Sequence, residues 1–199
     1  MTTVLLNGWA VSEAAARDAL DAAPETNLQV IPPSPNWQEL LADAQANVLV
    51  GYSTGAMLLL SEPKLAERFE RVVLLAPFTD FRAESGQGGN VRSAQLKYLL
   101  RMLKKDPLTT VHDFYDRAGL KMPRPTELPL PVDDLRWGIE QLLNRSAEEW
   151  TLEDVECWVG GADPLLDAER LKELCPALHV LQGVGHDLSE LAAGAGLSL

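Results

Sequence analysis

The first 77 residues alternate between short apolar runs and longer stretches in which apolar and polar positions follow a helical period. The apolar runs have the length of strands buried on both faces, and they cover residues 3–6, 28–31, 47–50 and 72–76. The helical stretches cover residues 12–23, 36–44 and 54–69, with a break near Pro63. Because the strands alternate with helices across short loops, the pattern predicts a parallel sheet with helices on both faces.

The alternation stops at residue 78 and returns near residue 150. A glycine-rich loop at 86–90 and a proline-rich bridge at 123–131 separate three stretches of helical period, at 93–104, from 106 onward and at 132–143. We therefore expect a helical cap at 78–149, inserted into a core made of 1–77 and 150–199; ordinary flanking helices are the alternative. The later strands are predicted at 155–161 and 178–181, with helices at 167–174 and from about 188. The fold class is α/β, with about six mostly parallel strands.

A serine lies where one apolar run meets a helix. Residues 51–55 read Gly-Tyr-Ser-Thr-Gly, after the run 47–50 and at the apolar start of the next helix. A serine in such a tight turn is held in strained backbone geometry, and side chains at Gly51 and Gly55 would collide with the adjacent strand or helix. The pattern predicts that Ser53 is a nucleophile at the carboxyl edge of the sheet. A plain strand–helix junction is the alternative.

A serine hydroxyl needs a nearby base to become nucleophilic at neutral pH. Of the three histidines, His186 follows Gly-x-Gly directly after the last predicted strand, at the same sheet edge as Ser53. His112 falls in a predicted cap helix and His179 inside a strand. We expect His186 to be the base.

The base in turn needs an acidic acceptor on its other ring nitrogen. Asp163 comes directly after the penultimate strand, which again places it at the carboxyl edge, and Ser53, Asp163 and His186 follow the chain order Ser…Asp…His. Asp167 is the competing acid if Asp163 belongs only to a turn; otherwise Asp167 would cap a helix. Asp187 is expected to cap the last helix.

Hydrolysis also requires hydrogen-bond donors for an oxyanion. The backbone amide of Thr54 opens a helix, where negative charge is stabilised. A second amide is expected from Trp9, because Gly8 allows the backbone of this loop to approach closely, and Trp9 could also form a wall of an acyl pocket. A turn with a packed aromatic side chain is the alternative for this loop.

The charge distribution limits the partners. The formal net charge of -12 argues against nucleic acids and anionic membranes. Residues 82–147 nevertheless contain eleven Lys or Arg against eight Asp or Glu, whereas the remainder contains six against twenty-one. A solvated helix face is the usual explanation for such a basic patch, but an acidic partner could also bind to it. Its residues between 91 and 105 are Arg92, Lys97, Arg101, Lys104 and Lys105.

The start of the chain has no basic leader with a cleavage site, and the sequence contains no apolar stretch of membrane-spanning length, so we expect a cytoplasmic protein without a membrane partner. The two cysteines, Cys157 and Cys175, are typical of reduced structural thiols. No His/Cys cluster has metal-ligand spacing, and no metal or other cofactor is expected.

The motifs at 7–9, 51–55, 161–163 and 183–186 together resemble the α/β-hydrolase superfamily across nearly the whole chain. The resemblance implies a shortened α/β-hydrolase fold with Ser53, Asp163 and His186 as a catalytic triad. A smaller part of the chain, at 106–114 and 128–143, is similar to the carboxylesterases of biotin synthesis, which cleave the methyl ester of pimeloyl-acyl-carrier protein. That similarity implies a serine carboxylesterase with an acyl carrier protein as partner.

The chain departs from these carboxylesterases at several positions. The loop that usually reads His-Gly-Trp-Gly has Asn7 and Ala10 here, a change that keeps the oxyanion amides. The family binds its carrier through arginines on a cap helix, and the matching positions here are Thr109 and Asp113. Carrier binding would therefore depend on Arg101, Lys104 and Lys105 instead. The alternatives are a small-molecule esterase or thioesterase that uses no carrier, and a non-catalytic ligand-binding protein with the hydrolase fold.

Overall fold

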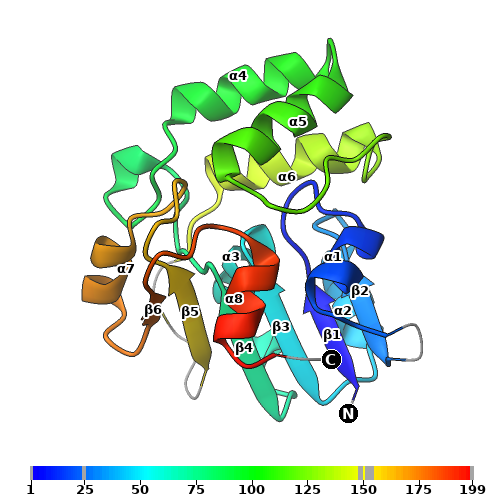
Figure 1. The fold of residues 1–199 in the computed structure, drawn as a ribbon, viewed down its shortest axis with the longest axis vertical. Helices are drawn as coiled ribbons and strands as arrows, with labels where there is room; N and C mark the ends of the chain where they lie inside the picture. Colours follow the sequence, from blue (N-terminus) through cyan, green and yellow to red (C-terminus); the bar gives the residue numbers. More distant parts are fainter. Residues whose placement is uncertain (1, 24–25, 148–149, 151–154, 198–199) are drawn as a thin grey trace.

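The computed structural model describes residues 2–23, 26–147, 150 and 155–197, and a six-stranded sheet lies at its centre (Figure 1). The strand order is β2-β1-β3-β4-β5-β6, and every neighbouring pair is parallel. The prediction of about six mostly parallel strands is confirmed. The strands are β1 Thr3–Leu6, β2 Leu28–Ile31, β3 Val48–Tyr52, β4 Arg71–Leu75, β5 Glu156–Gly160 and β6 His179–Leu181.

Helices cover both faces of the sheet, which explains why β1 and β3 consist entirely of buried residues. α1 (Glu13–Ala19) packs against α8 (Leu188–Gly194) on one face. α2 (Trp37–Asp43) and α3 (Thr54–Ser61) lie on the other face, and α7 (Ala168–Leu174) packs beside β6 (Figure 1).

The order of the strands reverses next to β1. The chain goes from β1 outward to β2 and then returns to β3 on the other side of β1. Loops that leave the carboxyl ends of two such strands run in opposite directions and leave a crevice where ligands bind in open α/β sheets. Here these loops contain residues 7–11 after β1 and Ser53 after β3.

Three helices lie beyond the carboxyl ends of the strands, over this crevice (Figure 1). They are α4 (Ser93–Leu103), α5 (Pro107–Ala118) and α6 (Val132–Asn144), and α4 packs against the other two. We call them the cap helices. The division into a core and a cap at 78–149 stays a prediction, and its boundary at residue 149 lies outside the described residues.

Two predicted helices were too long. α1 ends at Ala19 rather than near residue 23, because Asp21 takes a left-handed conformation with φ of 54°. α3 ends at Ser61, and a short 3-10 turn, η1 (Pro63–Leu65), replaces the predicted second half. Pro63 has no amide hydrogen to donate and disfavours helical geometry at the preceding Glu62, where φ is -138°. A second 3-10 turn, η2 (Ala83–Ser85), follows β4. Every helix in the described residues is too short or too polar to cross a bilayer.

Candidate active site

Ser53 occupies a strained turn between β3 and α3. Its φ of 52° and ψ of -115° lie outside the regions that side-chain-bearing residues ordinarily adopt. A conformation of this kind costs about 1–3 kcal/mol and persists only where the surroundings impose it. The turn directs the chain from the buried strand straight into the helix, so Ser53 lies at the crevice described above.

The two glycines of the motif explain how this turn closes. A Cβ at Gly55 would lie 2.0 Å from the backbone oxygen of Leu6 in β1, and a Cβ at Gly51 would lie 2.7 Å from the side chain of Leu59 in α3 and 2.9 Å from that of Leu74 in β4. The sequence prediction that larger side chains would collide with the adjacent strand and helix is therefore confirmed.

The structure brings Ser53, His186 and Asp163 together. Nδ1 of His186 lies 2.6 Å from Oδ2 of Asp163, and Nε2 lies 2.8 Å from Oγ of Ser53. The three residues are only 1–7% exposed, so little solvent competes for these hydrogen bonds. With the Nδ1 proton donated to the carboxylate, Nε2 can accept the hydroxyl proton of the serine.

The competing acids have other partners. Asp167 is the N-cap of α7, where its side chain accepts from the amide of Arg170. Asp187 is the N-cap of α8, as the sequence predicted, and its second oxygen accepts from the backbone amide of Lys121 at 2.7 Å. The other carboxylate oxygen of Asp163 accepts from the amide of Leu165 at 2.8 Å, which fixes its orientation toward the imidazole.

The other two histidines lie outside this arrangement. His112 is on α5, with Nε2 2.8 Å from the carbonyl oxygen of Pro125. His179 is exposed on β6 and stacks on Trp158 with ring centroids 4.2 Å apart.

The residues predicted to supply the oxyanion donors lie close to Ser53 in the chain or in space. Thr54 is the first residue of α3, where the helix leaves amides without an intrahelical acceptor. Gly8, which precedes Trp9, is so close to the serine turn that a Cβ on it would lie 3.4 Å from Cβ of Ser53. Within the described residues, neither the amide of Trp9 nor that of Thr54 donates to another group.

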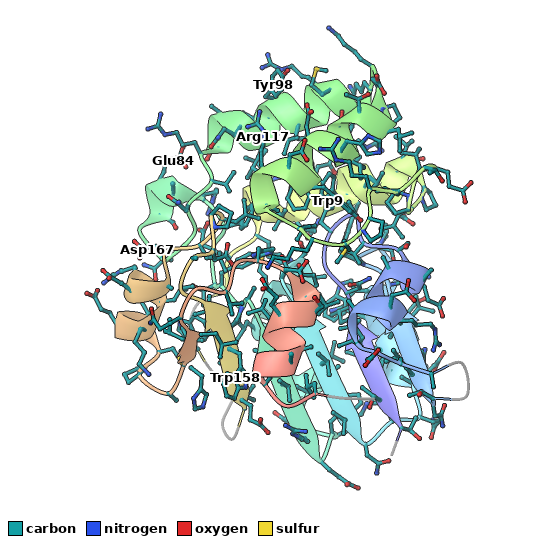
Figure 2. All side chains as sticks on the ribbon, viewed as in Figure 1. Trp9, Glu84, Tyr98, Arg117, Trp158 and Asp167 are labelled. Atoms are coloured by element: carbon teal, nitrogen blue, oxygen red, sulfur yellow. The ribbon has the colours of Figure 1, made fainter. Side chains whose placement is uncertain are left out.

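The cap helices hold the loop that carries Trp9. Trp9 lies beneath the cap helices (Figure 2). Its indole Nε1 donates to the carbonyl oxygen of Leu135 in α6 at 2.7 Å, and its ring meets Phe114 of α5 edge-on. The hydroxyl of Tyr115 donates to the carbonyl oxygen of Ala10 at 2.9 Å. Ala10 has φ of 60°, which favours glycine, so this bond stabilises an unusual backbone conformation in the loop.

Tyr52 was not identified from the sequence, although it belongs to the serine motif. Its hydroxyl donates to the backbone carbonyl oxygen of His186 at 2.7 Å, so the residue before Ser53 holds the loop that carries His186. Burial, with the nearby carboxylates of Asp187 and Asp163, holds the pKa of the Tyr52 hydroxyl well above its usual value. A tyrosine in an apolar, fully buried strand needs an acceptor for its hydroxyl, and this was the available signal.

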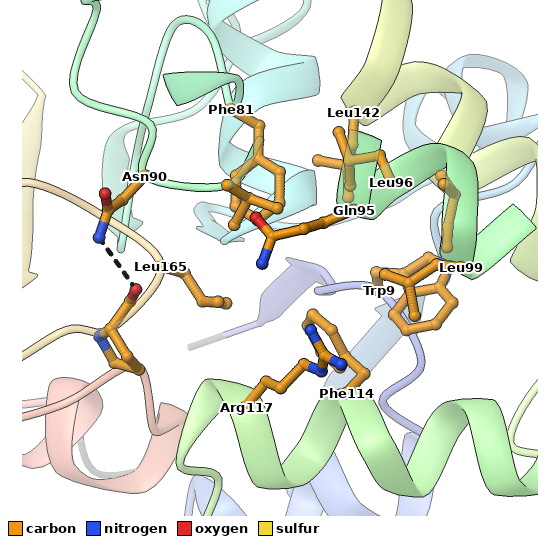
Figure 3. A pocket seen from close by; sticks show the side chains of 13 residues that line it. Trp9, Phe81, Asn90, Gln95, Leu96, Leu99, Phe114, Arg117, Leu142 and Leu165 are labelled. Carbon is orange, nitrogen blue, oxygen red and sulfur yellow. Dashed lines mark hydrogen bonds between the residues drawn. The ribbon is translucent and has the colours of Figure 1, made fainter. Parts of the chain in front are cut away.

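A pocket of about 240 Å³ lies between the cap helices and the sheet (Figure 3). Two of its lining residues adjoin the Ser53–His186–Asp163 cluster: Trp9 follows Gly8, and Leu165 donates its amide to Asp163. The expectation that Trp9 forms a pocket wall is confirmed. Its main apolar lining residues are Trp9, Phe81, Leu96, Leu99, Phe114 and Leu165.

The three cations predicted to bind a carrier lie elsewhere, on the end of α4 and the turn after it. Arg101, Lys104 and Lys105 are all exposed, and none forms an ion pair within the described residues. The guanidinium of Arg101 lies 6.0 Å from the ring centroid of Tyr98, which is itself 43% exposed (Figure 2). Thr109 and Asp113 are exposed on the neighbouring helix α5.

The sheet is parallel, and a serine in a strained turn lies at its switch point. A histidine and an aspartate follow later strands and lie beside this serine. These features together define the α/β-hydrolase class. The chain belongs to the alpha/beta hydrolase family, whose family model matches residues 4–195. No curated protein sequence matches this chain.

Several solved structures share this fold. An esterase from Exiguobacterium antarcticum is 13% identical, with a TM-score of 0.70 over 94% of this chain and 85% of that chain. BioG from Haemophilus influenzae is 12% identical, with a TM-score of 0.60 over 100% of this chain and 94% of that chain. An esterase from Rhodococcus sp. ECU1013 is 20% identical, with a TM-score of 0.62 over 100% of this chain and 91% of that chain. At these identities the similarity establishes the fold alone.

Proposed function

We propose that this protein is a serine carboxylesterase. The observation that supports the proposal most directly is the continuous hydrogen-bonded series from Ser53 Oγ through the His186 imidazole to the Asp163 carboxylate. Ester hydrolysis requires a nucleophile, a base and an orienting acid in this order, next to donors for an oxyanion.

In the acylation step, Oγ of Ser53 attacks the ester carbonyl carbon while Nε2 of His186 takes the hydroxyl proton. The carbonyl oxygen becomes an oxyanion, which the amides of Trp9 and Thr54 stabilise. Collapse of this tetrahedral intermediate breaks the bond to the alcohol oxygen, and the imidazolium donates its proton to the leaving alcohol. Asp163 keeps Nδ1 protonated and stabilises the imidazolium throughout.

In the deacylation step, water replaces the alcohol. His186 accepts a proton from this water, whose oxygen attacks the acyl carbon. The second tetrahedral intermediate collapses, Oγ of Ser53 leaves with the proton from His186, and the carboxylic acid is released. No metal or redox cofactor takes part in either step.

We further propose that the substrate is an acyl methyl ester, with pimeloyl-acyl-carrier-protein methyl ester of biotin synthesis as the specific candidate. This proposal is supported by the resemblance of residues 106–114 and 128–143 to carboxylesterases of that pathway. The apolar pocket under the cap would hold the acyl chain, and the exposed Arg101, Lys104 and Lys105 would receive the acidic carrier.

A small-molecule esterase without a carrier is the second candidate. Thr109 and Asp113 occupy the α5 positions at which the resembling carboxylesterases carry arginines, and this favours a free substrate. Rising ionic strength separates the two candidates, because it would reduce carrier-linked turnover much more than turnover of a free ester.

The test of the esterase proposal is the rate of p-nitrophenyl butyrate hydrolysis by the wild type and by Ser53→Ala. We expect the variant to lose at least about a thousandfold in kcat/KM with an unchanged circular dichroism spectrum. Ser146→Ala, which changes an exposed serine, is the control and should retain full activity. Full turnover by Ser53→Ala would eliminate Ser53 as the nucleophile, and labelling of Ser53 by a fluorophosphonate without turnover of any ester would favour a ligand-binding protein.

A further inference from the structure

The pocket under the cap contains one cation, Arg117 of α5, in a lining that is otherwise apolar or neutral. Among the residues that the structure describes, no Asp or Glu lines this pocket. Figure 3 shows the guanidinium of Arg117 pointing into the pocket from α5. Arg117 is an exposed residue overall, so solvent screens part of its attraction for an anion.

Arg117 differs from most arginines in the described residues because it has no carboxylate partner there. The chain has 29 acidic residues for 17 Lys and Arg, and most arginines in the described residues are paired with a carboxylate. Within the same residues Arg117 forms no ion pair, and no hydrogen bond from its guanidinium is found. Its neighbour Asp116 is paired with Arg124 instead, and Asp113, one turn earlier, lies beyond ion-pair distance of Arg117.

A second donor enters the pocket from α4. The side-chain oxygen of Gln95 accepts from the backbone amide of Arg92 at 2.8 Å, so the amide nitrogen of Gln95 retains two hydrogens to donate. Figure 3 shows this side chain directed into the same space as Arg117. The third polar lining residue, Asn90, directs its own nitrogen to the carbonyl oxygen of Pro164 at 3.3 Å. The guanidinium of Arg117 and the side-chain nitrogen of Gln95 are therefore the donors available to a ligand.

We infer that Arg117 and Gln95 bind an anionic group on the acyl part of the substrate, so that the enzyme selects esters whose acyl part carries a negative charge. This inference rests on the esterase function proposed above and specifies its substrate class. A planar guanidinium donates two parallel hydrogen bonds to a carboxylate or phosphate, and the Gln95 amide adds a third donor. The pocket volume of about 240 Å³ lies below the roughly 300–1,000 Å³ of drug-sized ligand sites, which favours a short acyl chain.

The anion can be a carboxylate at the end of the chain or the phosphate of a pantetheine arm. The first source is represented by monomethyl adipate, with methyl 6-methylheptanoate as its uncharged counterpart of the same shape. The second is represented by a methyl-ester acyl pantetheine with and without its 4′-phosphate. Methanol release measures kcat/KM for each compound.

Two variants test the inference. Arg117→Gln removes the charge, and Gln95→Glu places a carboxylate beside Arg117 while retaining an acceptor for the amide of Arg92. Arg124→Gln is the matched control, since it removes the same charge from an exposed arginine paired with Asp116. We expect Arg117→Gln and Gln95→Glu to lose about tenfold or more in kcat/KM for the anionic member of at least one pair. Turnover of the uncharged member should stay within about twofold, and the control should match the wild type.

The inference would be overturned if Arg117→Gln and Gln95→Glu changed kcat/KM equally for the charged and uncharged members of both pairs. It would also be overturned if neither variant changed kcat/KM for any of these compounds. A binding measurement separates this result from failure of the esterase function. If the wild type hydrolyses no ester, adipate or 4′-phosphopantetheine should still raise its Tm, and Arg117→Gln should abolish that rise. A wild type that shows neither anion-dependent turnover nor an anion-dependent rise in Tm would contradict the inference independently of the chemistry.

Discussion

The hydroxyl of Tyr52 donates a 2.7 Å hydrogen bond to the backbone carbonyl oxygen of His186, across 134 positions in the sequence. The two residues come from the ends of different segments, since Tyr52 ends β3 and His186 follows β6. The bond holds the loop that carries His186 against the end of the strand that leads to Ser53. We therefore regard Tyr52 as a positioning residue, because its hydroxyl binds the backbone of His186 and not the imidazole ring.

Tyr52→Phe should lower the free energy of unfolding by about 1–3 kcal/mol, because the buried carbonyl of His186 loses its donor. It should also reduce kcat several-fold with little change in KM, because the imidazole is held less firmly. Denaturant unfolding and steady-state kinetics measure these effects. Tyr98→Phe, on the exposed face of α4, is the control and should change neither quantity.

Alkaline pH gives a second measurement on the same variant. The pKa of Tyr52 in the folded protein is raised above the unfolded value of about 10, so its contribution to stability is complete below about pH 10 and is lost as the pH rises toward the folded-state pKa. In Tyr52→Phe, the free energy of unfolding should therefore fall less steeply above about pH 10 than in the wild type. An identical slope would mean that Tyr52 ionises equally in both states.

Asp163→Asn should reduce kcat by about a thousandfold or more, because the amide cannot stabilise the imidazolium or hold the correct tautomer. Asp167→Asn is the matched control. Asparagine caps helices about as well as aspartate, so this variant should retain activity and lose little stability. If Asp167→Asn had the larger effect on kcat, the assignment of the acid would be wrong.

Gly55→Ala should destabilise the protein by about 3 kcal/mol or prevent folding, because the new Cβ would meet the backbone oxygen of Leu6 at 2.0 Å. Gly185→Ala is the comparison, since no atom lies within 4 Å of a Cβ built at that glycine. Thermal unfolding of the two variants should differ by well over 5 °C.

Gly138→Ala tests the contact between the cap and the oxyanion loop. In an ordinary helix the change would stabilise by about 1 kcal/mol. Here the new Cβ would lie 2.5 Å from the indole of Trp9, so we expect a lower kcat from displacement of the Trp9 amide. A rise in Tm with unchanged kcat would show that the loop does not depend on this contact.

Replacing Arg101, Lys104 and Lys105 together by glutamine should reduce turnover of a carrier-linked methyl ester by about tenfold at low salt, through slower association. Hydrolysis of p-nitrophenyl butyrate should not change, because these side chains are exposed at the end of α4 and in the turn after it. An equal loss for both substrates would indicate damage to the fold instead. If neither substrate is affected, the carrier does not bind these cations.

The sequence predicted the sheet and the proximity of Ser53, His186 and Asp163 because these depend on short-range patterns. An apolar run followed by Gly-Tyr-Ser-Thr-Gly can adopt few backbone conformations. His186 and Asp163 each follow a strand closely in the sequence. The end of a parallel strand determines the edge of the sheet at which the next residue appears. Strand order was not needed to place all three side chains at one edge.

Contacts between the cap and the core could not be predicted in the same way. Trp9 and Leu135 are 126 positions apart, and Tyr115 and Ala10 are 105 apart. Neither pair belongs to a motif, and each depends on how an amphipathic helix is placed after a long irregular connection. The role inferred for Arg117 has the same origin, because it depends on the pocket that α5 forms with the other cap helices and not on a sequence motif.

The bonds from Leu135 and Tyr115 to the loop at residues 7–11 have a consequence for protein engineering. The helices that cover the pocket and the loop proposed to stabilise the oxyanion are joined by these hydrogen bonds, although they lie far apart in the sequence. A chimaera that received the helices of another hydrolase at 93–144 would lose the Tyr115 hydroxyl that supports Ala10, unless the new helix carried a tyrosine there, and would keep an acceptor for Trp9 only if a backbone carbonyl lay at the same place. Swapping substrate preference between relatives would therefore require residues 7–11 to be transplanted together with the helices.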